Sequence, residues 1–179
     1  NVAPDRTVQV YELARSGERV SGRPVRRFGA ASGPGVIRVA ESVLVDDQHD
    51  RVFLCNEDDA EQCVKVYDRE GRFTGPILAA GLIRGEAEGI ALYPQGDGDG
   101  VLIVTDQQKT ISIWHIYDRR TLAHRGAFTG APTVANTDGI CVHVTPFGPF
   151  TGGALFAVHD DLEVRAYDMA AVLKAVARR

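Results

Sequence analysis

The chain has 179 residues, 44% of them hydrophobic and 25% charged, which is enough apolar material for one folded core. Its formal net charge of −4 argues against general nucleic-acid binding, which needs a concentrated basic face. No apolar run approaches the roughly 20 residues of a membrane-spanning helix, so we expect neither a nucleic-acid nor a membrane partner. The chain starts at Asn1 without an initiator Met or a leader-like segment, and we expect a mature or excised piece.

Two strand-like runs come first, at residues 8–13 and 25–28. Because only these two runs precede the first complete repeat unit, we interpret them as the third and fourth strands of a unit whose beginning is absent.

Three similar units follow, each with an acidic residue, an apolar run, a polar loop, a second apolar run, another loop and a third run ending in Tyr-Asp. The Tyr-Asp pairs are 50 residues apart each time, at Tyr67-Asp68, Tyr117-Asp118 and Tyr167-Asp168. The acids are Glu41, Glu88 and Asp138. The runs lie at 43–45, 52–54 and 64–67, then at 90–92, 102–104 and 113–117, and finally at 140–142, 155–157 and 164–167. Short β-branched and aromatic runs bounded by turn residues predict strands.

Three hairpin-linked strands and a weaker fourth, repeated every ~40 to 50 residues, are typical of a β-propeller blade. We therefore predict an all-β fold of four-stranded antiparallel blades. The Ala-rich segment 169–176 predicts a short C-terminal helix. The expected blade units are 1–35 (partial), 36–81, 82–131 and 132–179, all within one partial propeller domain.

This count gives about three and a half blades, whereas propellers close with roughly 4 to 8. An open array would leave sheet edges uncovered. We therefore expect a partner, either the missing N-terminal half of the polypeptide or a second copy of the chain.

The cysteines allow two interpretations. Cys55 and Cys63 flank a hairpin loop, where they could form a disulfide, which would imply an oxidising compartment. They could equally be two small, half-buried strand residues. Cys141 lies in an apolar run and is expected in the core.

The acids that open the units are the strongest candidates for chemistry. The first strand of each blade lines the central channel of a propeller, so Glu41, Glu88 and Asp138 should converge. Glu86 and Glu88 are two residues apart and should share one face of an extended strand. Convergent carboxylates repel one another, and a hard divalent cation such as Ca2+ relieves that repulsion with oxygen ligands alone.

Other acids have a simpler explanation. Acids beside turn residues are common in solvated turns, and we assign Asp46, Asp47, Asp50, Asp58 and Asp59 to such turns. A structural hydrogen-bonding role at each strand start would also explain the register of Glu41, Glu88 and Asp138.

Several other side chains are expected to be architectural. Each Tyr of the Tyr-Asp pairs should pack between blades while its Asp begins a turn. His115 should be a packing residue, whereas His159, at a strand end, is harder to dismiss as a functional residue.

A set of short stretches, in this order and spacing, resembles the C-terminal half of the β-propeller phytases. These stretches lie at 10–13, 25–28, 40–41, 46–47, 56–58, 86–89, 136–139 and 155–158. The resemblance runs through nearly the whole chain and implies half of a six-bladed propeller.

The resemblance further implies calcium-dependent hydrolysis of phytate, inositol hexakisphosphate, by a secreted or periplasmic enzyme of the 3-phytase type. In that family a calcium-bound water attacks phosphorus. The positions that match the family's calcium-site carboxylates are Glu41, Glu57, Glu86, Glu88 and Asp138, with Asp160 as a weaker match. Of these, Glu86, Glu88 and Asp138 are the expected catalytic residues.

The chain also departs from the family pattern. Ser42 follows Glu41 where Gly is common, Asn56 stands where a paired Glu is common, and Pro132-Thr133 replaces an expected Asp-Gly. The basic and tyrosine residues that hold phosphates in the family belong mostly to the half not represented here. Two alternatives therefore remain, a non-catalytic propeller module with a degenerate calcium site and a calcium-dependent lactonase-type propeller.

Overall fold

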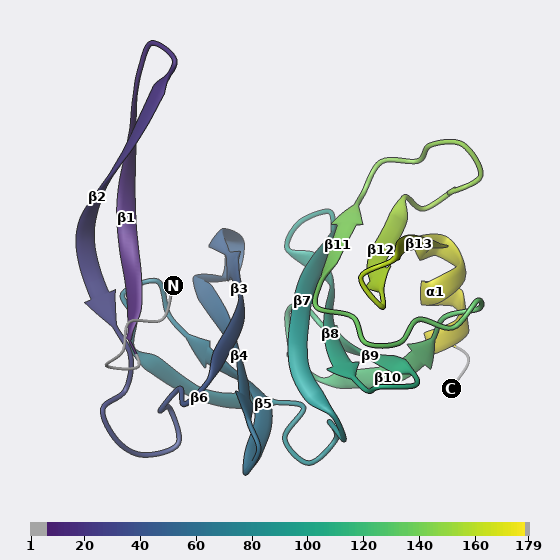
Figure 1. The fold of residues 1–179 in the computed structure, drawn as a ribbon, viewed down its shortest axis with the longest axis horizontal. Helices are drawn as coiled ribbons and strands as arrows, with labels where there is room; N and C mark the ends of the chain where they lie inside the picture. Colours follow the sequence, from purple (N-terminus) through teal and green to yellow (C-terminus); the bar gives the residue numbers. More distant parts are fainter. Residues whose placement is uncertain (1–6, 178–179) are drawn as a thin grey trace.

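The computed structural model describes residues 7–177, which form four antiparallel sheets and one α-helix (Figure 1). The first complete sheet contains β3 (Ala40–Asp46), β4 (Arg51–Asp58), β5 (Glu61–Tyr67) and β6 (Phe73–Leu78) in sequence order, with a short 3-10 helix, η1 (Asp47–His49), between β3 and β4. The second sheet contains β7 (Glu86–Gln95), β8 (Asp99–Gln107), β9 (Ser112–Asp118) and β10 (His124–Thr129). Each is a four-stranded meander of the kind that makes a propeller blade.

The third sheet has three strands, β11 (Ile140–His143), β12 (Ala154–His159) and β13 (Glu163–Asp168). The helix α1 (Met169–Val176) follows directly and packs against β13 and β10. Its buried residues are Met169, Val172 and Val176. The helix therefore occupies the place in the sequence where the other two sheets have a fourth strand. No helix in the described residues is both long and apolar enough to cross a membrane.

The N-terminal strands β1 (Val8–Ser16) and β2 (Arg19–Phe28) form a separate hairpin, which extends away from the other sheets (Figure 1). Both strands are longer than predicted. Gly17 at the hairpin tip has a φ of +61°, and this left-handed turn lets the ladder continue to the pair Ser16–Arg19. The added residues are exposed and mostly polar, which is why hydrophobic patterning missed them.

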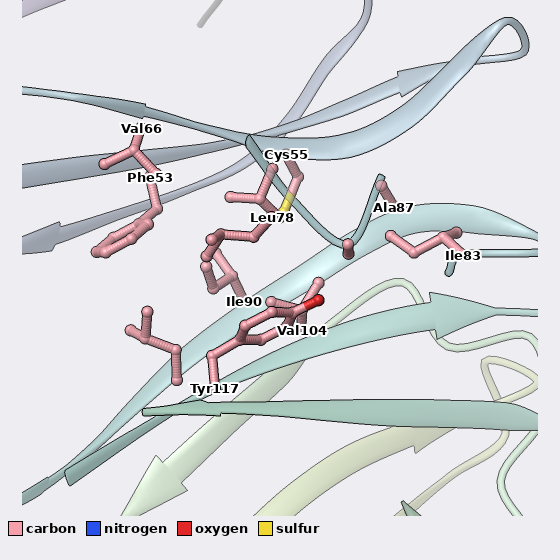
Figure 2. Close-up of a cluster of buried hydrophobic side chains, with 12 residues drawn as sticks. Phe53, Cys55, Val66, Leu78, Ile83, Ala87, Ile90, Val104 and Tyr117 are labelled. Carbon is pink, nitrogen blue, oxygen red and sulfur yellow. The ribbon is translucent and has the colours of Figure 1, made fainter. Parts of the chain in front are cut away.

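The inner strands of the three blades lie side by side, as predicted. β7 contacts both β3 and β11, so the first strands of all three blades gather on one side. Figure 2 shows the core between the first two sheets, where Phe53 and Leu78 of the first sheet face Ile90, Val104 and Tyr117 of the second. Burial of each such large side chain is worth ~1.5–3 kcal/mol, so this contact holds the two blades together. The predicted all-β propeller architecture with a C-terminal helix is confirmed.

The Tyr-Asp pairs are architectural, as predicted. Tyr67, Tyr117 and Tyr167 are all buried in hydrophobic clusters. The following aspartates accept backbone N–H groups of turns; Asp118 Oδ1, for example, accepts from the N–H groups of Arg120 and Thr121 at 3.0 and 2.8 Å.

The disulfide interpretation is wrong for this structure. Cys55 and Cys63 are both free and buried. Cys55 is paired with Val64, whereas Cys63 is paired with Asn56. Paired residues share a face and neighbours in a strand alternate, so the two thiols point to opposite faces of the sheet.

Two further expectations are also corrected. Cys141 is exposed because it alternates along β11 with Ile140 and Val142, whose side chains pack against the core. Asp46 is not a solvated turn residue. It is 1% exposed, and its carboxylate accepts two hydrogen bonds from Arg119, at 2.9 Å from Nε and 2.6 Å from Nη2. Arg119 follows β9, so this ion pair joins the first sheet to the second.

Candidate metal centre

Three carboxylates from three different strands meet at one end of the inner strands. Glu41 of β3, Glu57 of β4 and Glu88 of β7 each place a carboxylate oxygen within 4.8 Å of the other two. Glu41 is exposed, whereas Glu57 and Glu88 are partly buried. Residues 47 positions apart in the sequence thus reach one point because two blades pack side by side.

A β-bulge sets the direction of two of these side chains. Ala40 pairs with Asn56 and Val43 with Leu54, so Glu41 and Ser42 together oppose the single residue Cys55. A bulge places one extra residue in a strand and re-aims its side chains, and bulges are enriched beside active sites.

The same bulge recurs one blade later. Ala87 pairs with Asp106 and Ile90 with Val104, so Glu88 and Gly89 oppose Thr105 alone. A Cβ on Gly89 would lie 3.0 Å from Ile140 Cγ1 and 3.1 Å from Thr105 Oγ1, so the third blade approaches closely here. The sequence signal for the bulge is an acid followed by a small residue.

The carboxylates act strongly on one another. Burial is the largest cause that raises the pKa of Glu57 to about 7, and a hydrogen bond and negative charge from Glu41 add to it. Burial also leads the causes that raise the pKa of Glu88 to about 7. The charges that add to the effect on Glu88 all come from carboxylates, those of Glu41, Glu57, Asp138 and Glu86. The site is therefore a centre of unneutralised negative charge.

Glu86 and Asp138 border this group. Glu86 is exposed and lies two residues before Glu88, on β7. Asp138 Oδ1 accepts a hydrogen bond from Gln107 Nε2 at 3.1 Å, which ties the third blade to the second. Both add negative charge at Glu88, as the sequence predicts for acids that converge.

Asp160 lies elsewhere in its blade. It is exposed, has a φ of +49° and forms the turn between β12 and β13 with Asp161. Its N–H donates to the carbonyl of Ala135 at 3.2 Å. Its assignment as a ligand stays a prediction, and the turn geometry alone accounts for an Asp at this position.

The departure at Asn56 has a structural explanation. Asn56 is fully buried, and its Oδ1 accepts the N–H of Arg38 at 2.7 Å and that of Val39 at 3.4 Å. Its Nδ2 donates to the carbonyl of Glu61 at 2.9 Å. Because Asn56 alternates with Glu57 along β4, its side chain points to the other face and fixes the segment that leads into β3.

Two polar residues that support this region lie outside the predicted set of ligands. Asp106 is fully buried and accepts the N–H of Gly85 at 2.8 Å and Nε2 of Gln108 at 3.0 Å. Gln107, 5% exposed, holds Asp138. Asp106 was noticeable in the sequence only as an acid at a strand end, and nothing distinguishes Gln107 from a surface glutamine.

Antiparallel blades packed through their inner strands, with carboxylates converging at one end of those strands, define a partial β-propeller with an acidic site. The sequence model of the Phytase family matches residues 5–172, and the chain belongs to this family. The chain is thus a phytase-like protein at the family level, and the family implies a phosphorylated substrate. A comparison with curated proteins finds no match.

Proposed function

We propose that this chain contributes half of a calcium-dependent phosphohydrolase site that acts on phytate. The observation that carries the proposal is the convergence of Glu41, Glu57 and Glu88 within 4.8 Å. Family membership supplies the phosphorylated substrate. Such a substrate is strongly anionic and would be repelled by this group of acids unless a cation lay between them.

The residues present fit calcium. Ca2+ binds oxygen ligands, carboxylates above all, and Glu41, Glu57 and Glu88 offer several such oxygens close together. Burial, and after it the negative charge of neighbouring carboxylates, raises the pKa values of Glu57 and Glu88, as expected for a group of acids without a counter-charge. When bound there, calcium would supply positive charge for the phosphate and make a water molecule a stronger nucleophile.

The protein's own residues would hold and orient the reacting groups. Glu41, Glu57 and Glu88 are the proposed ligands, with Glu86 and Asp138 at the border of the site. The bulges at Glu41 and Glu88 aim both side chains toward the same point, and Gln107 fixes the Asp138 carboxylate. Prior placement of these groups lowers the cost of ordering them around a substrate. We assign Glu86, Glu88 and Asp138 to catalysis because Glu86 and Asp138 lie close enough to Glu88 to add to the rise in its pKa.

Completion of the propeller is part of the proposal. Val43 and Val45 of β3 are 57% and 49% exposed, and Val164 of β13 is 65% exposed. These apolar side chains lie on the first four-stranded sheet and on the three-stranded third sheet. We infer that an N-terminal half or a second copy covers them, and that the assembly works outside the cytoplasm.

One sample tests this function. Its solution mass and its release of phosphate from phytate should be measured together, with calcium and with a calcium chelator. We expect calcium-dependent release from an assembly larger than one chain or from the chain joined to its other half. Calcium-independent release, or none from a completed propeller, would reject the proposal.

A second candidate, a calcium-stabilised propeller without catalysis, is favoured by Asn56. That side chain is committed to backbone groups where a second acid is common in the family. Calcium would then raise the thermal midpoint, but the completed propeller would release no phosphate. The family match favours the phytase class over a lactonase-type propeller.

A further inference from the structure

Two histidine rings meet at the outer edge of the second sheet. Nδ1 of His115, on β9, lies 3.3 Å from Nε2 of His124, on β10. The ring centroids are 5.4 Å apart, and the ring planes are inclined by 45°. The strand order of this sheet is β10-β9-β8-β7, so β8 lies between this pair and Glu88 on β7. The two imidazoles therefore form a group of their own, apart from the carboxylate site.

The register of β9 and β10 places both rings on one face of the sheet. His124 pairs with Tyr117, and His115 lies two residues before Tyr117 along β9. Residues two apart along a strand share a face, and diagonal neighbours across a strand pair are within reach of aromatic side chains. A β-bulge at Arg125 follows directly, and Gly126 supplies its backbone with a φ of +132°. Such a bulge increases the local twist and re-aims the side chains beside it.

Both rings are held in place before any ligand binds. His115 is only 7% exposed. The exposed His124 ring packs against the ring of the buried Tyr117, with centroids 5.0 Å apart. The turn before His124 is fixed by Asp118, whose N–H donates to the carbonyl of Ala123 at 2.8 Å. Groups that are already ordered lose less entropy when they bind a ligand.

The separation of the two nitrogens matches that of two ligands on one metal ion. Two Zn–N bonds of ~2.0–2.1 Å at the tetrahedral angle place their nitrogens about 3.3–3.4 Å apart. N–H donors usually lie ~2.7–3.2 Å from an oxygen acceptor, so 3.3 Å is long for a hydrogen bond. The geometry therefore suits a shared ion better than a shared proton.

The surroundings of His115 favour the form of the ring that binds metals. Its Nε2 is buried and has no hydrogen-bond partner among the residues that the structure describes. Burial, and after it the charge of His124, lowers the pKa of His115, which favours the neutral ring. A neutral imidazole is the ligand form. The negative charge of Asp106 acts on this ring in the opposite sense and would stabilise a cation bound to it.

We propose that Nδ1 of His115 and Nε2 of His124 bind a divalent transition-metal ion of the Zn2+, Ni2+ or Cu2+ class. Water fills the remaining positions of the ion. The ion joins β10 to β9 and so fastens the outer strand of the second sheet. Imidazole suits these metals, whereas Ca2+ and Mg2+ take oxygen ligands. The site is therefore independent of the proposed calcium function, and either one can fail without the other.

The test must exclude two other sets of ligands. Cys141 and His143 are both exposed and lie two residues apart on β11, so they share a face and could hold a soft metal ion. The reference protein is therefore the full chain with Cys141→Ser. Excess calcium is added to occupy the carboxylates, at about pH 7.5 so that imidazoles are neutral.

Zn2+ binding to this reference protein is measured by calorimetry, and 15N NMR of the histidine rings identifies the ligand atoms. We expect a single ion per chain, with shifts at Nδ1 of His115 and Nε2 of His124. Partners outside the ligand shell of a metal are already worth ~10- to 100-fold in affinity, so His124→Asn should weaken binding at least tenfold. The matched control is His143→Asn, another exposed histidine on a strand, and it should bind like the reference.

Melting curves give a second measurement. Zn2+ should raise the thermal midpoint of the reference protein and leave that of His124→Asn unchanged, because only a folded chain brings the two rings together. Without metal the two proteins should melt at similar temperatures, since the His124 ring is exposed. Absence of Zn2+ binding by the reference protein, or equal affinity in His124→Asn, would overturn the site. A loss of binding only in His143→Asn would place the ion on β11 and overturn it as well.

Discussion

Glu41 and Glu88 occupy the same place in two successive blades, each within a β-bulge on the innermost strand. In each case the acid and the small residue after it oppose a single residue of the second strand, Cys55 in one blade and Thr105 in the next. Because β3 and β7 lie side by side, the two carboxylates meet although they are 47 positions apart. The repeated bulge is thus the local device that builds the acidic site.

Loss of the Glu88 carboxylate should abolish most function. Even partners outside the ligand shell of a metal are worth roughly 10- to 100-fold in affinity or activity, so Glu88→Gln should cost at least that much. Calcium affinity and phosphate release from phytate in the completed propeller are the measurements. Glu70→Gln, an exposed acid in the turn after β5, is the control and should behave like the parent. Unchanged turnover in Glu88→Gln would remove Glu88 from the site.

The metal-free chain should lose stability as the pH rises. The folded-state pKa values of Glu57 and Glu88 are about 7, against 4.5 for an unperturbed Glu. Between pH 4.5 and about 7 the folded state therefore holds more protons than the unfolded state, and the free energy of unfolding falls with increasing pH. With a chelator present, the thermal midpoint should be higher at pH 5 than at pH 8.

The variant Glu57→Gln, Glu88→Gln tests the source of this pH dependence. Its thermal midpoint should change less between pH 5 and pH 8 than that of the parent, because the two titrating groups are gone. A parent chain that becomes more stable over this range would contradict the assignment.

Calcium should stabilise the fold most where the acids are ionised. A ligand at 100 times its dissociation constant adds ~2.7 kcal/mol to the free energy of unfolding, or about 5–10 °C in thermal midpoint for a domain of this size. Melting curves with calcium and with magnesium at pH 8 measure the effect. Glu41→Gln should reduce the shift strongly. A calcium shift that survives this change would place the ion elsewhere.

The buried ion pair between Asp46 and Arg119 should be essential for the packing of the first two blades. Removing one partner of a buried pair leaves an unpaired charge and costs ~3–5 kcal/mol. Asp46→Asn should lower the free energy of unfolding by about that amount in urea denaturation. Arg119 also donates to the carbonyl of Asp99, and this hydrogen bond would keep the unpaired guanidinium in its buried position. Asp47→Asn, an exposed neighbour, should change little. Equal stabilities of the two variants would refute the role of the pair.

Thiol reactivity should separate the three cysteines. Cys55 and Cys63 are buried and free, whereas Cys141 is exposed. Burial also raises the pKa of the Cys63 thiol to about 11, which disfavours the reactive thiolate. The native chain should therefore react at one thiol and the denatured chain at three, without reductant. Cys141→Ser should remove the native reaction. A chain with only one reactive thiol after denaturation would restore the disulfide.

The sequence by itself determined most of the strands and the short C-terminal helix, because these depend on local patterns of two or four residues. The spacing of the Tyr-Asp pairs determined the blade repeat. It also predicted which acids open the blades, since their register follows the repeat. The resemblance to phytases agrees with the family match over residues 5–172.

Only the tertiary structure decided which acids meet and which do not. Glu57 joins Glu41 and Glu88, whereas Asp160 remains in a turn and Asp46 pairs with an arginine 73 positions away. Strand register decided the cysteines, because a shift of one residue moves a side chain to the other face of the sheet. These outcomes depend on bulges and on packing between blades, which join residues too distant in the chain for any local pattern to relate.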